Sequence, residues 1–447
     1  MPESSDPKDE PPGNLLVLAI VALIGGTGAG LVGALFRLGL IDANRARNEM
    51  IHWAHGWSFG GFAVLVMLVA LCAALAAWLV RRYSPHASGS GIPQIEAALN
   101  GTLPPPRIRL IFVKFIGGVL AIGSGLALGR EGPTIQMGAT FAYETGRWFK
   151  RNWEDCRALL AAGGGAGLAT AFNAPIAGAI FVLEELDKQF ETRMAIAALA
   201  ASAAAIWVER WLLGNRLDFT VRALAPPSFA HQPLYLLLGI VMGFAGLAYN
   251  RTLLWGLKTS DRFAAWPIEA RAAAVGAAIA CIAWFAPVLV GGGDALTQHA
   301  LDGFHALDGL GALALLPSIY LLRLAMITGS YGVRTPGGLF APLLVLGAVL
   351  GLWIGKLCAL ALPGLGIQPV GFALVGMAAL FTGIVRAPVT GIVLITEMTG
   401  NVTMLLPMLV ACCAAMLVPT LLGNEPVYES LGARLRQQER LASRPTA

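Results

Sequence analysis

The chain has 447 residues, of which 56% are hydrophobic and 13% are charged, and its mean hydropathy is +0.69. A soluble enzyme needs more charge on its water-exposed surface, and disordered, collagen-like and disulfide-scaffold chains have other compositions, so all four classes are excluded. The net charge of +5 comes without a dense basic block, which argues against a nucleic-acid partner. The composition therefore predicts an all-α integral membrane protein.

The N-terminal residues 1–14 are rich in acids and prolines, which predicts a short mobile cytoplasmic tail and no signal peptide. Apolar segments follow, most of them near or above the length of about 20 residues that a spanning helix needs. They lie at 15–41, 59–80, 106–128, 158–183, 194–213, 233–256, 269–290, 309–329, 338–362, 369–396 and 402–422. Gly and Pro interrupt the stretches 106–183 and 309–396 most often. Matching interruptions in two halves predict discontinuous helices that line a site inside the membrane.

Three short motifs recur in one order at nearly constant spacing, at 89–91 and 291–293, at 129–138 and 338–347, and at 174–184 and 387–397. The first is a glycine turn, the second has the pattern G-x-x-x-P-x-x-x-x-G, and the third joins A-P-x-x-G to a glutamate. Chance matches in a Gly-rich chain are the alternative, because each motif alone is weak. The set predicts membrane repeat 1 over 15–215, a connection over 216–232, membrane repeat 2 over 233–423, and a final segment over 424–447.

The turns that begin at Gly89, Gly129 and Gly338 have the features of an anion site. Glycine lets backbone N–H groups converge on a ligand, and the N-terminus of a helix carries a partial positive charge. Three such turns can hold an anion without a full positive charge, which keeps binding weak enough for transport. The alternative is that these turns only allow helices to pack closely.

Glu131 is the most informative single residue, because it lies inside one of these turns. An ionised carboxylate there competes with the permeant anion, and a protonated one must leave, so one side chain couples proton and anion occupancy. The alternative for Glu131 is a salt bridge to the adjacent Arg130. Glu184 and Glu185 end an apolar run, where an ordinary helix end at the water boundary is the alternative to an acid inside the membrane. Lys114 either extends its amine to the surface or supports the anion path electrostatically.

Clusters of basic residues indicate how the chain is oriented in the membrane. They lie at Arg81–Arg82, at Arg147–Arg157 and at Arg434, Arg436, Arg440 and Arg444, while 299–308 has no Lys or Arg. By the positive-inside rule the basic clusters are cytoplasmic and 299–308 is outside, and both termini are expected inside.

At these residues the chain resembles the CLC family of chloride channels and proton-coupled chloride transporters, over about residues 15–440. The stretches Gly89–Pro93, Gly129–Pro133 and Gly338–Pro342 match the three signature stretches of the family in order, and Pro426–Tyr428 resembles a fourth. The resemblance implies two inverted-topology repeats of tilted and discontinuous helices, one pore per subunit, and a homodimer in a lipid bilayer.

The same resemblance implies roles for individual residues. The hydroxyls of Ser90 and Tyr428 and the backbone N–H groups of Leu339 and Phe340 would hold the central anion, in a turn that also includes Gly132. Glu131 would be the external gate and Glu185 the internal proton-transfer acid. The supporting residues are Lys114, Arg130, Gly129 and Gly338.

The acid at Glu185 makes proton/chloride antiport the first interpretation, and a voltage- or pH-gated passive chloride channel with the same pathway the second. The resemblance further implies that Ser90 favours chloride over nitrate, because nitrate-preferring members carry Pro there, and that fluoride is not the substrate, because the signature stretches differ from those of the fluoride-exporting branch. An intramembrane enzyme is the third hypothesis, and the sequence carries no catalytic arrangement for it. We expect no metal, because the histidines are scattered and the cysteines lack a ligand spacing, and no other cofactor. We expect no nucleotide, since the chain ends about twenty residues after Tyr428, and we expect a bacterial inner membrane.

Overall fold

The computed structural model of the chain describes residues 13–304 and 310–442. Residues 1–12 of the expected tail, residues 305–308 at the end of the polar stretch 299–308, and Arg444 therefore lie outside the described residues. In the described part the secondary structure is helical, with two isolated β-bridges and no strand. Seven of these helices are long and apolar enough to cross a membrane. The described structure thus agrees with an all-α integral membrane protein.

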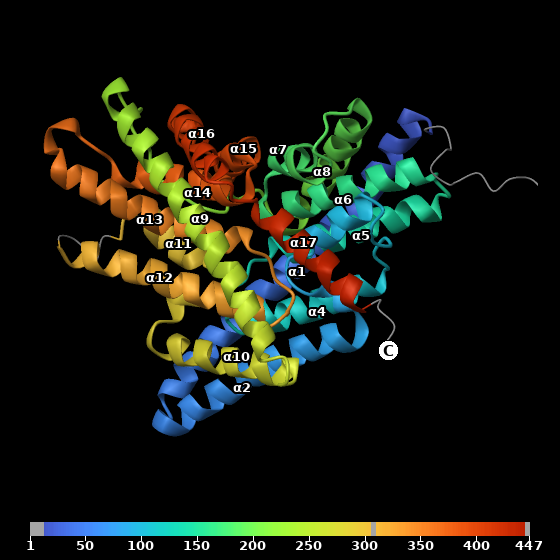
Figure 1. Ribbon diagram of the computed structural model, residues 1–447, viewed down its shortest axis with the longest axis horizontal. Coiled ribbons are helices and arrows are strands. Elements are labelled where there is room, and N and C mark those ends of the chain that lie inside the picture. The colour runs from blue at the N-terminus through green and yellow to red at the C-terminus, as the bar shows by residue number, and fades with distance from the viewer. Residues whose placement is uncertain (1–12, 305–309, 443–447) are drawn as a thin grey trace, which may run out of the picture.

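From residue 13 to the middle of the chain, the structure describes eight α-helices and one π-helical turn. They are α1 (Leu15–His55), α2 (Ser58–Tyr83), α3 (Ile92–Leu99), α4 (Arg109–Gly123), α5 (Glu131–Trp148), α6 (Trp153–Phe172), α7 (Pro175–Phe181), the π-helical turn Val182–Leu186 and α8 (Thr192–Leu213). The short 3₁₀ turn Pro85–Ala87 precedes α3. In Figure 1 the helices α5 to α8, drawn in cyan and green, lie on the right side of the molecule.

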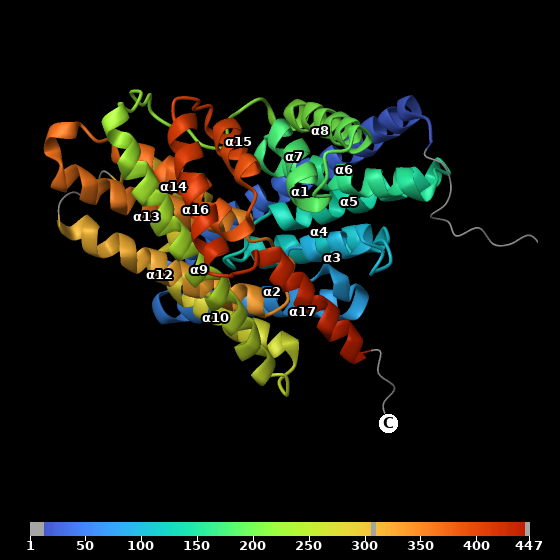
Figure 2. The same cartoon turned by 45° about the horizontal axis from the view of Figure 1, so that its top comes forward.

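The second half contains nine α-helices in the described residues. They are α9 (Gln232–Arg262), α10 (Ile268–Phe285), α11 (Asp294–Leu301), α12 (Leu310–Gly332), α13 (Phe340–Ala361), α14 (Pro369–Val385), α15 (Pro388–Thr399), α16 (Leu405–Leu421) and α17 (Val427–Ala442). Figure 1 shows α12 to α14 on the left side, opposite α5, α6 and α8, and Figure 2 shows the same separation after rotation. Helix α17 crosses between the two groups.

Interrupted helices occur where the sequence predicts them. The segment 158–183 is broken between α6 and α7, where Asn173 has a φ of +48° and Pro175 begins the next helix. The segment 369–396 is broken in the same way, because Arg386 has a φ of +74° and Pro388 begins α15. Proline suits the first turn of a helix since it needs no intrahelical N–H partner there. The same local device therefore recurs in both halves.

Helix α5 is an element that the apolar pattern does not reveal. Its residues Glu131–Trp148 include Thr, Gln and Glu, yet nearly all of them are buried. Other helices surround α5, so its polar groups find partners inside the protein instead of water. Thr140, for example, donates its hydroxyl hydrogen to the Gln136 carbonyl at 2.6 Å. Hydropathy detects contact with lipid, and α5 has little of it.

Small residues bring helices into backbone contact at equivalent places within each half. A Cβ atom at Gly138 in α5 would lie 2.5 Å from the carbonyl oxygen of Gly163 in α6. A Cβ atom at Gly347 in α13 would likewise lie 2.5 Å from the carbonyl oxygen of Gly376 in α14. Close approach at glycine is the usual way for helices to pack tightly in a membrane.

The two halves also cap each other at α7 and α15. The Glu184 carboxylate accepts hydrogen bonds from Val389 N at 3.0 Å and from Thr390 N at 2.7 Å, at the start of α15. The Glu397 carboxylate accepts them from Ile176 N and Ala177 N, at the start of α7. A carboxylate satisfies the free N–H groups of a helix N-terminus and complements its dipole. These reciprocal bonds join equivalent positions of the repeat, which has inverted topology.

Candidate functional site

The three predicted turns meet at the centre of the molecule through backbone hydrogen bonds. Gly129 N donates to Gly338 O at 2.8 Å, and Gly338 N donates to Gly129 O at 2.7 Å. Gly89 N donates to Thr335 O, and Gly337 N donates to Gly89 O, both at 3.1 Å. The helices α3, α5 and α13 begin directly after these turns. Three helix N-termini are thereby held at one place.

The backbones in this cluster are too close for side chains. A Cβ atom at Gly132 would lie 2.7 Å from Ser90 Cα and 2.9 Å from Gly338 Cα. Real Cβ atoms do not approach other atoms so closely, so these turns require glycine. This close approach is expected whether the turns bind an anion or only allow the helices to pack closely. The side chains around the turns distinguish these two interpretations.

Glu131 is fully buried, and its carboxylate lies on the N-terminus of α13. Its Oε1 accepts a hydrogen bond from Phe340 N at 2.6 Å. Its Oε2 is buried and has no hydrogen-bond partner among the described residues. A backbone N–H at a helix N-terminus is the natural partner of an anion. The carboxylate of Glu131 therefore occupies a position in which a free anion would also be stabilised.

Arg130 makes no salt bridge to Glu131 in the described structure, so the alternative for Glu131 is wrong. The Arg130 guanidinium donates Nε to the Ala171 carbonyl at 2.7 Å, Nη2 to Asp218 at 2.9 Å and Nη1 to Asp294 at 3.2 Å. Asp218 also pairs with Arg37. Arg130 thus ties the turn to α6, to the connection between the halves and to α11.

Ser90 and Tyr428 are buried beside the same cluster. Ser90 Oγ accepts a hydrogen bond from Ile92 N at 3.4 Å, at the start of α3. The Tyr428 ring lies 5.9 Å from the Phe340 ring, centroid to centroid, and the hydroxyl of Tyr428 has no partner among the described residues. Leu339 is the N-cap of α13 and is also buried. The structure thus brings these predicted residues to the cluster that holds Glu131.

Lys114 does not extend to the surface. It is fully buried in α4, and its Nζ donates to the carbonyl oxygens of Gly89 at 2.7 Å and Ala87 at 3.1 Å. These carbonyls belong to the turn that carries Ser90. Lys114 therefore fixes the first turn from behind through these hydrogen bonds.

Glu185 lies apart from the glycine cluster, in the π-helical turn that follows α7. It is 3% exposed, and its Oε1 has no partner among the described residues. It lines a cavity of about 490 Å³ together with Glu184, Lys188 and Glu429. An acid at an ordinary helix end would face water, so that alternative is wrong for Glu185. π-helical turns occur often at functional sites.

Three residues of this region are absent from the sequence-based prediction. Tyr331 accepts a hydrogen bond from Ser90 N at 3.4 Å through its hydroxyl, and Asp218 holds Arg130. Arg323 is fully buried in α12 and donates to the carbonyls of Leu289, Gly291 and Gly292. Arg323 stands 209 positions after Lys114, the offset that also separates the second motifs. That spacing was the signal that could have identified it.

Comparison with known proteins identifies the family. The voltage-gated chloride channel family matches residues 72–420. The H(+)/Cl(−) exchange transporter ClcA of Vibrio parahaemolyticus is 36% identical over 94% of this chain and 90% of its own length. The chain belongs to the CLC family. The ClcA transporter of Yersinia pestis is 36% identical over 95% of this chain and 89% of its own length.

Solved structures of the CLC family have the same fold. A slow cyanobacterial Cl−/H+ antiporter matches with a TM-score of 0.88 and 32% identity, over 95% of this chain and 99% of that one. A CLC-type fluoride/proton antiporter matches with a TM-score of 0.76 and 22% identity, over 93% of this chain and 97% of that one. At that identity the second match bears on the fold alone. The fold is that of the family, with two inverted repeats.

Proposed function

We propose that this chain is a proton-coupled chloride antiporter, a transporter and not an enzyme. The observation that carries the proposal is the Glu131 carboxylate on the backbone N–H of Phe340. Chloride and a carboxylate compete for this place because both are anions that the N-terminus of α13 stabilises. The names of the exchange transporters to which the chain is similar support the same function.

In this mechanism chloride binds between the turns, next to the hydroxyls of Ser90 and Tyr428 and the N–H groups of Leu339 and Phe340. Glu131 blocks the path while it is ionised. When it binds a proton it loses its charge and its attraction to the helix N-terminus, so it leaves and chloride replaces it. One side chain therefore exchanges one kind of ion for the other. Gly129, Gly132 and Gly338 keep the turns close enough for this competition.

Glu185 is proposed as the internal proton acceptor. Its carboxylate is buried at the wall of a cavity that exposed charged residues also line, so it can exchange a proton with water at that side. It lies outside the glycine cluster, and a proton route separate from the chloride route follows from that separation. A passive channel needs no such acid, which is why the exchanger is preferred to a gated chloride channel.

The experiment is proton flux from purified protein in liposomes that hold a chloride gradient, with Glu185→Gln and Glu131→Gln beside the wild type. We expect chloride-driven uphill proton movement in the wild type and its loss in both variants, while chloride still moves. Glu429→Gln is the matched control, because Glu429 lines the same cavity but is half-exposed. Chloride flux without proton movement in the wild type would establish the channel instead.

Assembly as a homodimer in a bacterial inner membrane is part of the proposal. Large apolar side chains are exposed on α7, α15 and α16, among them Ile176, Val389 and Leu409, and they suit a subunit contact or lipid. Both termini are proposed to be cytoplasmic. Ion pairs support this orientation, since Arg81 pairs with Glu269 at 2.6 Å and Arg434 pairs with Asp261, which brings two basic clusters to one face.

We also propose the division into repeats at 15–215 and 233–423, joined by 216–232. The end of α8 at Leu213 and the start of α9 at Gln232 support these boundaries, as does the end of α16 at Leu421. The connection contributes Asp218 to the Arg130 contacts, so it also braces the site.

A further inference from the structure

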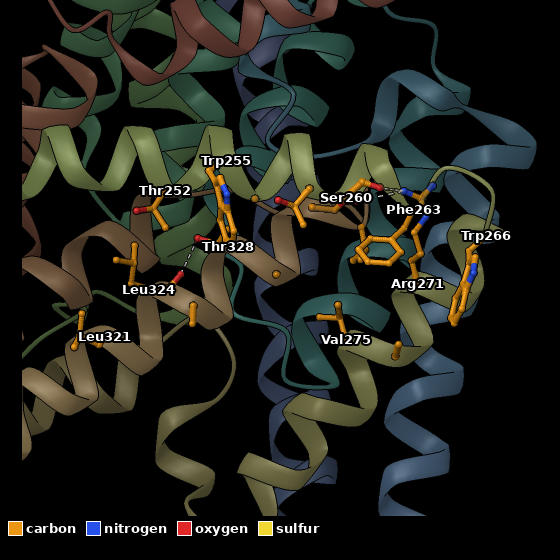
Figure 3. Close-up of a pocket in the computed structure, with 17 residues that line it drawn as sticks. Thr252, Trp255, Ser260, Phe263, Trp266, Arg271, Val275, Leu321, Leu324 and Thr328 are labelled. Carbon is orange, nitrogen blue, oxygen red and sulfur yellow. Dashed lines mark hydrogen bonds between the residues drawn. The ribbon is translucent and has the colours of Figure 1, made fainter.

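A lateral groove lies between α9, α10 and α12, apart from the glycine cluster (Figure 3). It encloses about 600 Å³. Leu321 and Leu324 line one end, and Val275 lies on the wall between them and Arg271, as Figure 3 shows. A groove of this size accepts a drug-sized or lipid-sized apolar group.

The other end of the groove carries one cation, Arg271 at the start of α10. Its Nη1 donates to Ser260 O at 2.8 Å and to Ser260 Oγ at 3.2 Å. Its Nε is buried and has no acceptor among the described residues. Arg271 also forms no salt bridge with an acid among the described residues, and the acids near it pair with other cations. A cation at the edge of the membrane is costly without a partner. The geometry leaves a place for an anionic group at Arg271.

The surroundings of Arg271 are positive, because the nearby acids already have partners. Asp261 pairs with Arg434 and lies 4.0 Å from Arg334, and Glu269 pairs with Arg81. The last two turns of α9 also carry exposed Lys258 and Arg262. Basic residues next to a membrane surface attract anionic lipids.

Aromatic side chains flank this end of the groove. Phe263 and Trp266 line it, whereas Trp255 lines the groove farther back along α9, beside Thr328; all three rings are more than half exposed. Trp is enriched at the level of lipid headgroups, where its ring is half in the apolar region and half in water. The groove therefore presents a cation and aromatic rings at the membrane surface, and an apolar channel that leads away from them.

We propose that this groove binds a phospholipid with an anionic headgroup, whose phosphate accepts hydrogen bonds from Arg271 and whose acyl chain lies along α12 between Val275 and Leu324. An uncharged or zwitterionic lipid would fill the apolar part but would gain less from the surplus of basic residues. The wall formed by α12 ends at Gly332, which accepts a hydrogen bond from Ser260 Oγ at 2.7 Å, so the polar end of the groove is joined to the end of α12.

The test uses purified full-length protein in vesicles of phosphatidylcholine that contain a minor fraction of phosphatidylglycerol. Bromine atoms on the acyl chains of one lipid or the other quench the fluorescence of tryptophans that they touch. We expect brominated phosphatidylglycerol to quench more than its surface fraction predicts, and this excess to fall in Trp255→Phe. In Arg271→Gln the preference for phosphatidylglycerol over phosphatidylcholine should fall about fivefold, because one basic residue near anionic lipid contributes about 1 kcal/mol. Arg271→Lys should keep most of it.

A second variant tests the apolar part without touching the charge. A Cβ atom at Gly329 would have only Val275 Cγ1 near it, at 3.9 Å, so the larger side chain of Gly329→Phe enters the groove without a backbone clash. We expect it to remove the excess quenching while the protein elutes as the wild type does. Equal quenching by both brominated lipids would overturn the proposal, and so would a preference that survives in both Arg271→Gln and Gly329→Phe. Neither result depends on proton or chloride transport.

Discussion

The glycine turns 89–91 and 291–293 are built alike. Each has two glycines with positive φ, at +63° and +87° in the first turn and at +76° and +103° in the second. Each precedes a helix of eight residues, α3 or α11. Each is held from behind by a fully buried cation that donates to backbone carbonyls of the turn, Lys114 in the first half and Arg323 in the second. The repeat thus supplies the same scaffold twice.

The side chains on the two turns differ. The first offers the hydroxyl of Ser90 and continues into the apolar Ile92, whereas the second has Gly292 and continues into Asp294, which pairs with Arg130. An acid in the first turn of a helix adds a negative charge next to the N-terminus that would otherwise stabilise an anion. The comparison teaches that the scaffold makes a helix N-terminus available, and that two side chains decide whether an anion can use it.

The largest effect is expected where the first turn meets its neighbours. In Gly132→Val the new side chain would overlap the backbone of Ser90 and Gly338, because even a Cβ atom would lie within 2.9 Å of both. We expect chloride transport to be lost, measured as chloride efflux from liposomes. Cys72→Ala, in the lipid-facing α2, should transport as the wild type does. Wild-type transport by a well-folded Gly132→Val protein would contradict the convergent-turn site.

The second-largest effect, a loss of chloride affinity, is expected when the first turn is given the sequence of the second. Ser90→Gly gives the turn three glycines and removes one hydrogen bond to the anion. Hydrogen bonds to charged groups contribute about 1.5–3 kcal/mol, so chloride affinity should fall by roughly 10- to 100-fold. Isothermal titration with chloride measures this directly. An unchanged affinity would mean that the backbone alone holds the ion and that the two turns differ for another reason.

The buried cations test whether the scaffold and the site can be separated. In Lys114→Met and in Arg323→Met the turn carbonyls lose their donors, which should lower the free energy of unfolding by about 1–3 kcal/mol in each case. Thermal melts in detergent detect this as a lower Tm. Chloride affinity should fall only in Lys114→Met, since only its turn carries Ser90. An equal loss of affinity in both variants would show that the second turn also contributes to the chloride site.

Much of this arrangement could be predicted from the sequence, because its local signals are strong. The spacing of Gly and Pro identified the three turns, and the breaks before Pro175 and Pro388 lie where the pattern placed them. The acid at Glu131 could be singled out because it lies inside a turn. These features are set by residues that are adjacent in the chain, so the sequence alone reveals them.

Other features depend on contacts between distant segments. Helix α5 escaped the hydropathy pattern because it is buried by protein and not by lipid. Arg130 looked like a partner for Glu131 by proximity in the chain, but three distant acceptors take its N–H groups. The difference between Glu184, which caps α15, and Glu185, which is buried beside a cavity, also arises only in the folded chain.

The smallest effect is expected from the reverse exchange in the second turn. Gly292→Ser supplies the missing hydroxyl, and the turn has room for it, because a Cβ atom there would meet only the Leu128 carbonyl oxygen at 3.5 Å. We expect no added chloride binding, since the negative charge of Asp294 in the first turn of α11 still repels an anion there. In Gly292→Ser/Asp294→Asn the acid is removed, and a weak second chloride site should then be detected by titration or by anomalous scattering from bromide. Gain of a site in Gly292→Ser alone would show that the hydroxyl, and not the acid, separates the two turns. If neither variant binds a second anion, the acid is not what closes the second turn, and the difference between the two halves has another physical cause.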